Sequence, residues 1–205
     1  MEKKIGDQSA HNSKMTAKDF VFAAVFGVLI FLVFMVFSML LMINVNLVWF
    51  THGIAAIPAG IIWAYLISKV NKRGLIITMG IIVGIVGFLM GMFWSAPVGI
   101  IVGAILAELI AGNPSTRTAK KLALAFAVFV FCFWLGHISL IFINAESYIQ
   151  MIINAGMSRE YAQGLVDFVY SPLCVLAGIA ALVGGFFGSL LGNKVFKKHF
   201  EKISA

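Results

Sequence analysis

Charged residues are scarce in this chain: Asp, Glu, Lys and Arg make up 11% of its 205 residues, while 61% are hydrophobic. Soluble domains carry roughly 25% charged residues, so this composition excludes a soluble fold and indicates a membrane protein. The length leaves room for six membrane spans with short loops, and for no separate soluble domain. A phosphate-binding loop of the Gly-x-x-x-x-Gly-Lys-Ser/Thr type is also missing, so any ATPase that drives this protein must be another chain.

Residues arranged for catalysis or metal binding are missing as well. The two cysteines, Cys132 and Cys174, lie inside apolar runs, which favours buried free thiols over a disulfide or a metal site. There are no paired carboxylates, no zinc-type spacing of histidines and no nucleophile elbow. We therefore predict no enzyme activity, no metal and no cofactor. An intramembrane enzyme with His137 and Glu108 as acid and base is the less favoured alternative.

The positive charges, in contrast, follow a regular alternation. Fourteen of the fifteen Lys and Arg residues fall on one side of a six-segment hydropathy pattern, and only Arg159 departs from it. Basic residues near span ends stay on the cytoplasmic side of a membrane. This alternation predicts a multi-pass protein of the bacterial cell membrane with both termini in the cytoplasm. It also explains the net charge of +7, with anionic lipid and not nucleic acid as the partner.

The apolar runs predict an all-α membrane protein, a compact bundle of six transmembrane helices. The runs are continuous and too long for the strands of a β-barrel, which alternate over roughly ten residues. The membrane domain is expected over 20–193, after a cytoplasmic segment (1–19) that lacks a signal peptide and before a basic cytoplasmic tail (194–205). The expected spans are 20–43, 48–68, 75–93, 96–111, 122–143 and 171–192.

The third outer loop, 144–170, is the longest connection and is expected to contain two short helices. The first is predicted over 146–154, ending before Gly156. The second is predicted over 158–168, with Ser158 as its N-cap. Its apolar and polar residues separate into two sides, so it is amphipathic and can lie on the membrane surface or cover a cavity.

Small residues recur four apart on three of the predicted spans. Such spacing lets helix backbones approach closely. The glycines of the third span (80, 84, 87 and 91) and of the sixth (184, 188 and 192) are interpreted as packing within the bundle. The first span carries Ala23 and Gly27, for which a contact with a partner protein is an equal alternative.

Glu108 is the single charged residue inside a predicted span, near the cytoplasmic end of the fourth. Ionisable residues within a membrane are functional candidates by default. At that depth Glu108 can pair with Arg117, Lys120 or Lys121, which favours a structural or coupling role. Contact with a substrate or a proton is the second interpretation.

Aromatic and neutral polar residues gather at the predicted outer boundary. An aromatic belt accounts for many of them. A few polar groups among aromatic rings also describe a small-molecule pocket, and no charged residue is expected in it. The candidate substrate-binding residues are Asn44, Asn46, Trp49, His52, Trp94, Trp134, His137, Asn144, Tyr148 and Tyr170.

Four stretches carry a resemblance to a known family: Lys18-Asp19 before the first span, the glycine-rich third span through Trp94, the segment 107–110 around Glu108, and 156–160 in the third outer loop. With six spans, about 200 residues and no ATPase, the chain resembles the substrate-binding subunit (S-component) of energy-coupling factor (ECF) transporters. More narrowly, it is similar to the Trep_Strep family of small bacterial integral membrane proteins.

The resemblance implies a function. An S-component captures a vitamin or similar micronutrient from outside in a pocket formed by outer loops and later spans. It works with a membrane coupling (T) subunit and two cytoplasmic ATPases. In such proteins an Ala-x-x-x-Ala motif on the first span meets the coupling subunit, and Ala23 and Gly27 occupy the matching positions. An accessory membrane protein without a solute remains an alternative.

Overall fold

The computed structural model describes the backbone of residues 14–200 and the side chains of residues 14–195, and this part of the chain is helical with no strand. The predicted all-helical class is therefore confirmed. The elements are α1 (Ala17–Leu41), the 3-10 turn η1 (Val48–Phe50), α2 (Thr51–Lys69), α3 (Leu75–Leu89), α4 (Ser95–Ala111), the 3-10 turn η2 (Pro114–Thr116), α5 (Ala119–Asn154), α6 (Arg159–Val169) and α7 (Pro172–Phe200).

Within the described residues, four helices are long and apolar enough to cross a membrane: α1, α2 with η1, α5 and α7. The apolar helices α3 and α4 are shorter, with 15 and 17 residues. At 1.5 Å per residue α3 is about 22 Å long, less than the ~30 Å hydrocarbon thickness. It ends at Leu89, before the predicted 93, because Gly91 adopts φ +89° and the Met92 N–H bonds back to the Gly87 carbonyl.

The helix starts carry local capping signals. The Thr16 backbone and hydroxyl both bond the Asp19 carboxylate, and Thr118 accepts from the Lys121 N–H at the start of α5. Ser158 accepts from the Tyr161 N–H, which confirms its predicted N-cap role.

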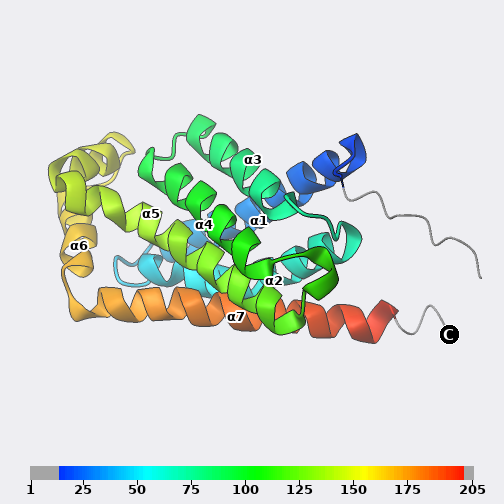
Figure 1. Cartoon of the computed structure of the whole chain (residues 1–205). Coiled ribbons are helices and arrows are strands. Elements are labelled where there is room, and N and C mark those ends of the chain that lie inside the picture. Colours follow the sequence, from blue (N-terminus) through cyan, green and yellow to red (C-terminus); the bar gives the residue numbers. More distant parts are fainter. Residues whose placement is uncertain (1–13, 201–205) are drawn as a thin grey trace, which may run out of the picture.

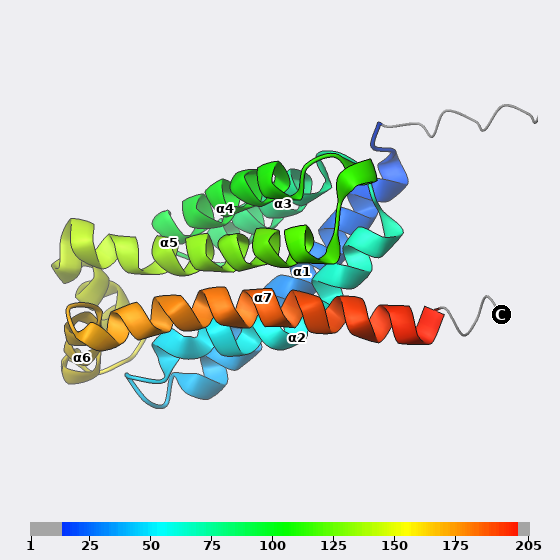
Figure 2. The same cartoon turned by 60° about the horizontal axis from the view of Figure 1, so that its bottom comes forward.

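The helices run alternately back and forth, so that the start of α1 and the end of α7 are at the same end of the molecule, opposite α6 (Figures 1 and 2). We call the end with the start of α1 the basic end and the end with α6 the loop end. The described basic residues other than Arg159 belong to the basic end: Lys14, Lys18, Lys69, Lys72, Arg73, Arg117, Lys120, Lys121 and Lys194. The side chains of Lys3, Lys4, Lys197, Lys198 and Lys202, like residues 1–13 and 201–205 of the predicted terminal segments, lie outside the described residues.

Glycines set the distance between α2 and α7. A Cβ atom added at Gly60 would overlap the backbone of Gly188, and one added at Gly184 would overlap the backbone of Gly53. The interpretation of the α7 glycines as internal packing is therefore confirmed. Gly80 of the third span behaves in the same way, since it lies directly against the side chain of Ala104 in α4. Gly91 does not, because a Cβ atom added there would meet no atom within 4 Å.

The small face of α1 also packs within the chain. Ala23 is fully buried, and a Cβ at Gly27 would lie 2.8 Å from Cγ of Met79 and 3.0 Å from Cγ2 of Val83, both in α3. Of the two residues predicted to contact a coupling subunit, Gly27 thus accommodates α3 in this structure and Ala23 is buried within the bundle. Such a contact would require α1 to move away from α3.

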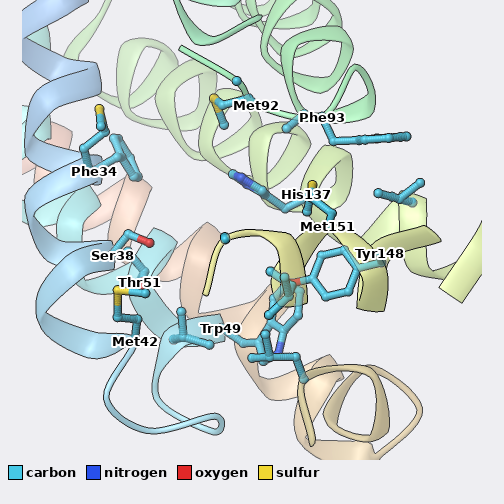
Figure 3. Close-up of a pocket in the computed structure, with 18 of the residues that line it drawn as sticks. Phe34, Ser38, Met42, Trp49, Thr51, Met92, Phe93, His137, Tyr148 and Met151 are labelled. Carbon is cyan, nitrogen blue, oxygen red and sulfur yellow. The ribbon is translucent and has the colours of Figure 1, made fainter. Parts of the chain in front are cut away.

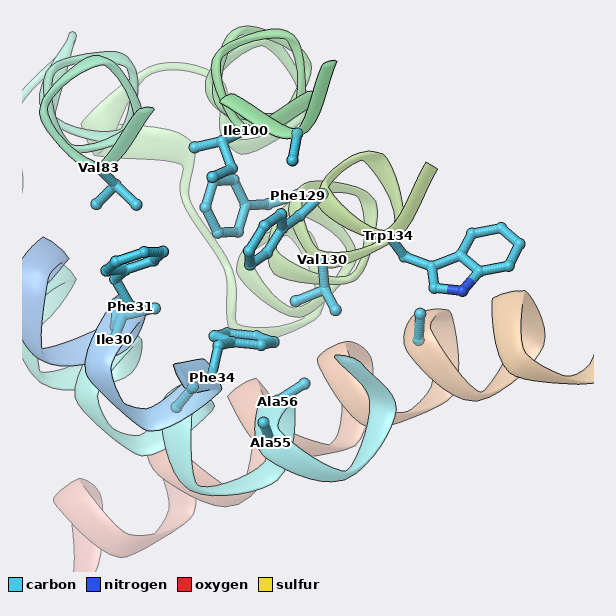
Figure 4. Packing of buried hydrophobic residues seen from close by; sticks show 14 of the residues in the cluster. Ile30, Phe31, Phe34, Ala55, Ala56, Val83, Ile100, Phe129, Val130 and Trp134 are labelled. Atoms are coloured by element: carbon cyan, nitrogen blue, oxygen red, sulfur yellow. The ribbon is translucent and has the colours of Figure 1, made fainter. Parts of the chain in front are cut away.

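Large apolar side chains fill the space between the helices. Phe31 and Phe34 of α1, Ile100 of α4 and Phe129 of α5 are buried and converge on one interior (Figure 4). Toward the basic end, Trp63 of α2 lies against the Phe126 ring of α5 at a centroid distance of 4.9 Å. This core holds α1, α2, α4 and α5 together beneath the loop end.

The predicted end of the fifth span, 143, falls directly before a break in the long helix α5. Asn144 departs from helical geometry (φ −159°, ψ 88°), and its side-chain oxygen accepts from the Ser147 N–H at 2.9 Å. Asn144 therefore breaks α5 and caps a second helical segment, 145–154. This segment corresponds to the first helix predicted in the third outer loop, and α6 to the second.

Candidate binding cavity

A cavity of about 590 Å³ lies at the loop end of the bundle (Figure 3). Small-molecule sites in proteins have volumes of about 300–1,000 Å³. Six parts of the chain contribute to its wall: the second half of α1, η1 with the first turn of α2, the turn 90–93, the start of α4, both segments of α5, and α6. The labelled lining residues in Figure 3 are Phe34, Ser38, Met42, Trp49, Thr51, Met92, Phe93, His137, Tyr148 and Met151.

Two histidines meet in the wall. Nε2 of His52, in the first turn of α2, lies 3.0 Å from Nδ1 of His137 on α5. The Phe133 ring, one turn before His137 on α5, is 4.8 Å from the His52 ring and 4.9 Å from the His137 ring, between ring centroids. The Phe34 ring of α1 also belongs to this cluster, with its centroid 6.0 Å from His52 and 5.4 Å from Phe133. The pair is thus held in an aromatic surrounding.

Several lining side chains carry a buried polar atom that has no hydrogen-bond partner among the described residues. They are Nε1 of Trp49, Oγ1 of Thr51, Nδ1 of His52 and Oγ of Ser95. An unpaired buried polar group costs about 1–3 kcal/mol. Each of these atoms is buried, and together they leave unmet hydrogen-bonding capacity within the wall of the cavity.

The rest of the lining is soft and uncharged. No Asp, Glu, Lys or Arg belongs to it, but seven of the ten methionines in the chain do. Methionine is flexible and polarisable, so it adapts to the shape of a bound apolar surface. These methionines are Met35, Met39, Met42, Met90, Met92, Met151 and Met157.

The segment 145–154 and α6 cover the cavity from the loop end. The Tyr161 hydroxyl on α6 donates a short hydrogen bond to the Met42 carbonyl after α1. Burial raises the pKa of Tyr161, so this donor stays protonated over the ordinary pH range. Trp49 stacks between Tyr148 and Phe168, at centroid distances of 6.4 and 6.2 Å. The cover is therefore attached to α1 and to η1.

Four of the ten candidate substrate-binding residues line this cavity: Trp49, His52, His137 and Tyr148. The sequence prediction thus named both histidines and two of the aromatic residues in the wall of this cavity. It did not foresee that His52 and His137, 85 positions apart, are hydrogen-bonded to each other.

The other six candidates lie outside the cavity wall. Asn44 accepts from the backbone of Asn46 and Leu47 and so shapes the turn after α1. Trp134 is buried between α5 and α7, against Gly178. Asn46, Trp94 and Tyr170 are exposed, the last two at 48% and 62%. Asn144 lies in a second, more open pocket with Glu146, Ser147 and Gln150.

Most of the wall carried no signal in the sequence. Phe34 and Met42 lie in or beside the first apolar run, where lining residues cannot be told from lipid-facing or core residues. Ser38 is the one polar residue of that run, but this alone did not assign it to a pocket. Thr51 and Ser95 begin helices, a position that small hydroxyl residues commonly occupy for capping. Tyr161 had a weak signal, because it lies on the amphipathic helix of the third outer loop.

Glu108 is far from this cavity, at the basic end. Its carboxylate accepts from the backbone N–H groups of Gly74 and Ile76 at 3.0 and 2.9 Å, and from Arg117 at 2.8 Å. It thereby caps the start of α3 and pairs with one of its three predicted partners. Burial lowers the pKa of Arg117, and the charge of Glu108 opposes this effect.

Metal binding has no visible basis in the described part of the chain. No group of three or more His, Cys, Asp or Glu side chains comes together there. Cys132 and Cys174 are buried free thiols, as predicted from their apolar surroundings.

Long apolar helices, glycine crossings between them and an uncharged cavity at one end define an all-helical integral membrane protein. The chain belongs to the family described as hypothetical bacterial integral membrane protein (Trep_Strep), whose model matches residues 17–202. This confirms the family predicted from the sequence and the integral membrane location. No curated protein and no solved structure matches the chain.

Proposed function

We propose that this protein is the S-component of an ECF transporter. It captures a small uncharged micronutrient, a vitamin or a vitamin precursor, outside the cell. It delivers that solute through a separate membrane coupling (T) subunit and two cytoplasmic ATPases. The observation that carries the proposal is the covered cavity of about 590 Å³ with aromatic, methionine and neutral polar walls.

The character of the wall supports a binder of neutral solutes. A buried ion without a partner of opposite charge costs far more free energy than a neutral polar group. With no charged residue in the lining, the part of the solute that enters the cavity is uncharged. The rings of Trp49, Tyr148 and Phe133 make part of the wall apolar and aromatic, which favours a solute with an apolar ring surface.

Orientation supports capture from outside. We propose six spans with both termini in the cytoplasm, because the basic residues concentrate at one end and basic residues stay inside. The cavity lies at the opposite end and therefore faces the exterior. The helices α3 and α4 are short, but α3 packs against α1 and α4 packs against α5. We therefore count both as membrane spans of the same bundle.

The partner surface in this proposal is α1. Of the four long apolar helices in the described residues, α1 is the least covered by the rest of the chain. Its outer face exposes Val21, Val25 and Leu29. Contact of Ala23 and Gly27 with the coupling subunit follows only after α1 separates from α3, which fits a transporter whose S-component moves during transport.

Mass spectrometry of the purified protein tests the proposal. After purification from rich medium and denaturation, the sample should release one small uncharged molecule per chain. Ser38→Trp should abolish this release, because it fills the cavity from α1. Val36→Trp on the exposed face of the same helix should not. A wild-type protein that is empty after growth in every medium contradicts the proposal.

Two alternatives are less well supported. An accessory membrane protein without a solute would not need a covered cavity with unpaired polar groups in its wall. An intramembrane enzyme would need Glu108 and His137 to act together. Glu108 is engaged with Arg117 and the start of α3 at the basic end, whereas His137 lines the cavity at the loop end.

A further inference from the structure

The histidine pair places two different ring nitrogens in two different surroundings. Nδ1 of His52 is buried and has no partner among the described residues, and the His52 side chain is 7% exposed. The ring of His137 is only half-buried and points into the cavity (Figure 3). Its Nδ1 is engaged with His52, which leaves its Nε2 as the nitrogen available to the cavity.

One hydrogen atom lies between the two rings. Both rings are neutral, because no carboxylate in the lining would offset a buried imidazolium. A neutral imidazole carries its hydrogen on one nitrogen and accepts on the other. If Nε2 of His52 donates to Nδ1 of His137, then His137 carries its own hydrogen on Nε2. If the donation runs the other way, Nε2 of His137 is a bare acceptor.

The buried Nδ1 of His52 decides between these arrangements. In the second arrangement this nitrogen would carry a hydrogen and would be a sealed N–H group without an acceptor. Among backbone groups, buried N–H donors without partners are rarer than buried acceptors left without a donor, and we extend this rule to the imidazole nitrogens. The first arrangement leaves Nδ1 of His52 as an unpaired acceptor and is favoured.

We propose that His137 presents an Nε2–H donor to the cavity, with His52 as the positioning residue that holds it in this form. The solute accordingly offers a hydrogen-bond acceptor, a carbonyl oxygen or a ring nitrogen, on an uncharged ring system. This inference rests on the proposed function and narrows its solute class. His137 binds the solute, while His52 acts through His137.

Two substitutions separate solute recognition from a structural role of the pair. Asparagine mimics Nδ1 of histidine, so His137→Asn retains a partner for His52 but has no group at Nε2. Glutamine mimics Nε2, so His52→Gln retains a partner for His137, yet its amide can donate or accept and no longer selects one ring form. Ser139→Ala is the control on α5, since the Ser139 hydroxyl bonds only the Gly136 carbonyl of its own helix.

The experiment has two readouts on protein in lipid nanodiscs. Nitrogen-15 NMR of labelled histidine reports which ring nitrogen carries the hydrogen, with signals assigned by their loss in the two variants. Ligand-observed NMR measures binding of N-methyl-2-pyridone, an uncharged ring with a carbonyl acceptor and no donor, against pyrrole, which has a donor and no acceptor. Empty nanodiscs supply the baseline.

In the wild type we expect hydrogen on Nε2 of His137 and binding of N-methyl-2-pyridone in preference to pyrrole. Loss of one buried hydrogen bond should weaken N-methyl-2-pyridone binding about tenfold in His137→Asn, with no change in Ser139→Ala. His52→Gln should give mixed ring forms of His137 and a smaller loss.

Hydrogen on Nδ1 of His137, a doubly protonated ring, or equal probe binding by wild type and His137→Asn would each overturn the inference. A protein that releases a stoichiometric solute but gives one of these results keeps its proposed function and loses this assignment. A protein that never carries a solute loses the proposed function, whatever ring form His137 has.

Discussion

The carboxylate of Glu108 and the guanidinium of Arg117 form an ion pair of 2.8 Å in which the side chains are only 6% and 2% exposed. Removing one partner of a buried pair costs about 3–5 kcal/mol, because the other charge stays buried alone. Glu108→Gln should therefore lower the thermal unfolding midpoint in detergent by several degrees. Its remaining amide oxygen can still cap one N–H group of α3.

The matched control for this prediction is Glu160→Gln, which removes an exposed carboxylate from α6. It should leave the midpoint unchanged within error. Equal midpoints for the two variants would show that the Glu108–Arg117 pair does not stabilise the basic end of the bundle.

The glycine contact between α2 and α7 gives a second prediction. A Cβ atom at Gly60 would meet the backbone of Gly188 and lie 2.5 Å from the Ser189 nitrogen, so neither helix can yield by rotating a side chain. Gly60→Ala should destabilise the fold by about 2 kcal/mol or more, because α2 and α7 must separate. Chemical denaturation in mild detergent measures this loss.

Gly164→Ala is the control for the glycine prediction. Gly164 lies in α6, and the nearest atom to an added Cβ would be Cγ1 of Val45 at 3.4 Å, an ordinary contact. Alanine is favoured over glycine in a helix by about 1 kcal/mol, so this variant should be at least as stable as the wild type. A neutral Gly60→Ala variant would indicate that α2 and α7 pack less closely than the structure has them.

Hydropathy and charge predicted the helices because a continuous apolar run and its basic flanks are local features. The end of the third span was missed because it depends on a single backbone position, Gly91, which stops α3. The predicted end of the fifth span, 143, falls directly before the break at Asn144. Contacts between segments that lie far apart in the sequence were harder to predict. The glycines of α7 were interpreted correctly, but their counterparts Gly53 and Gly60 were not identified, since a lone glycine in a run has no pattern.

The cavity shows the same limit. Its residues come from six segments, and only the aromatic and histidine members stand out in an apolar sequence. The pairing of His52 with His137 depends on the crossing of α2 and α5, which sequence spacing does not contain. The pairing of Glu108 with Arg117 could be predicted from the sequence, because the two residues are only nine positions apart.

Membrane orientation gives a third prediction. In a background with Cys132 and Cys174 replaced by alanine, Glu160→Cys in α6 should react with a membrane-impermeant maleimide added to intact cells. Lys120→Cys at the basic end should react only after the cells are opened. Both positions are exposed in the structure, so burial does not limit either reaction. Labelling of Lys120→Cys in intact cells would reverse the orientation and remove the basis for capture from outside.

The hydrogen bond from Tyr161 to the Met42 carbonyl gives a fourth prediction, on the cover of the cavity. Tyr161→Phe removes this bond and should speed amide hydrogen exchange in α6 by about fivefold, since a hydrogen bond contributes about 1 kcal/mol. Tyr170→Phe, at an exposed ring, is the control. Unchanged exchange in Tyr161→Phe would mean that the stacking of Trp49 on Phe168 alone holds the cover.

The sequence left two roles open for Ala23 and Gly27 on α1: packing within the chain and contact with a coupling subunit. A fifth prediction distinguishes them. Leucine at Gly27 would collide with Met79 and Val83 of α3, so Gly27→Leu should lower the unfolding midpoint, whereas Val25→Leu on the exposed face should not. Solute uptake by cells that also produce the proposed coupling subunit and ATPases is the second measurement. Lost uptake together with a lower midpoint assigns Gly27 to packing within the chain. Lost uptake at an unchanged midpoint, with solute release from the purified protein preserved, would instead place the coupling subunit on this face and require α1 to leave α3 during transport.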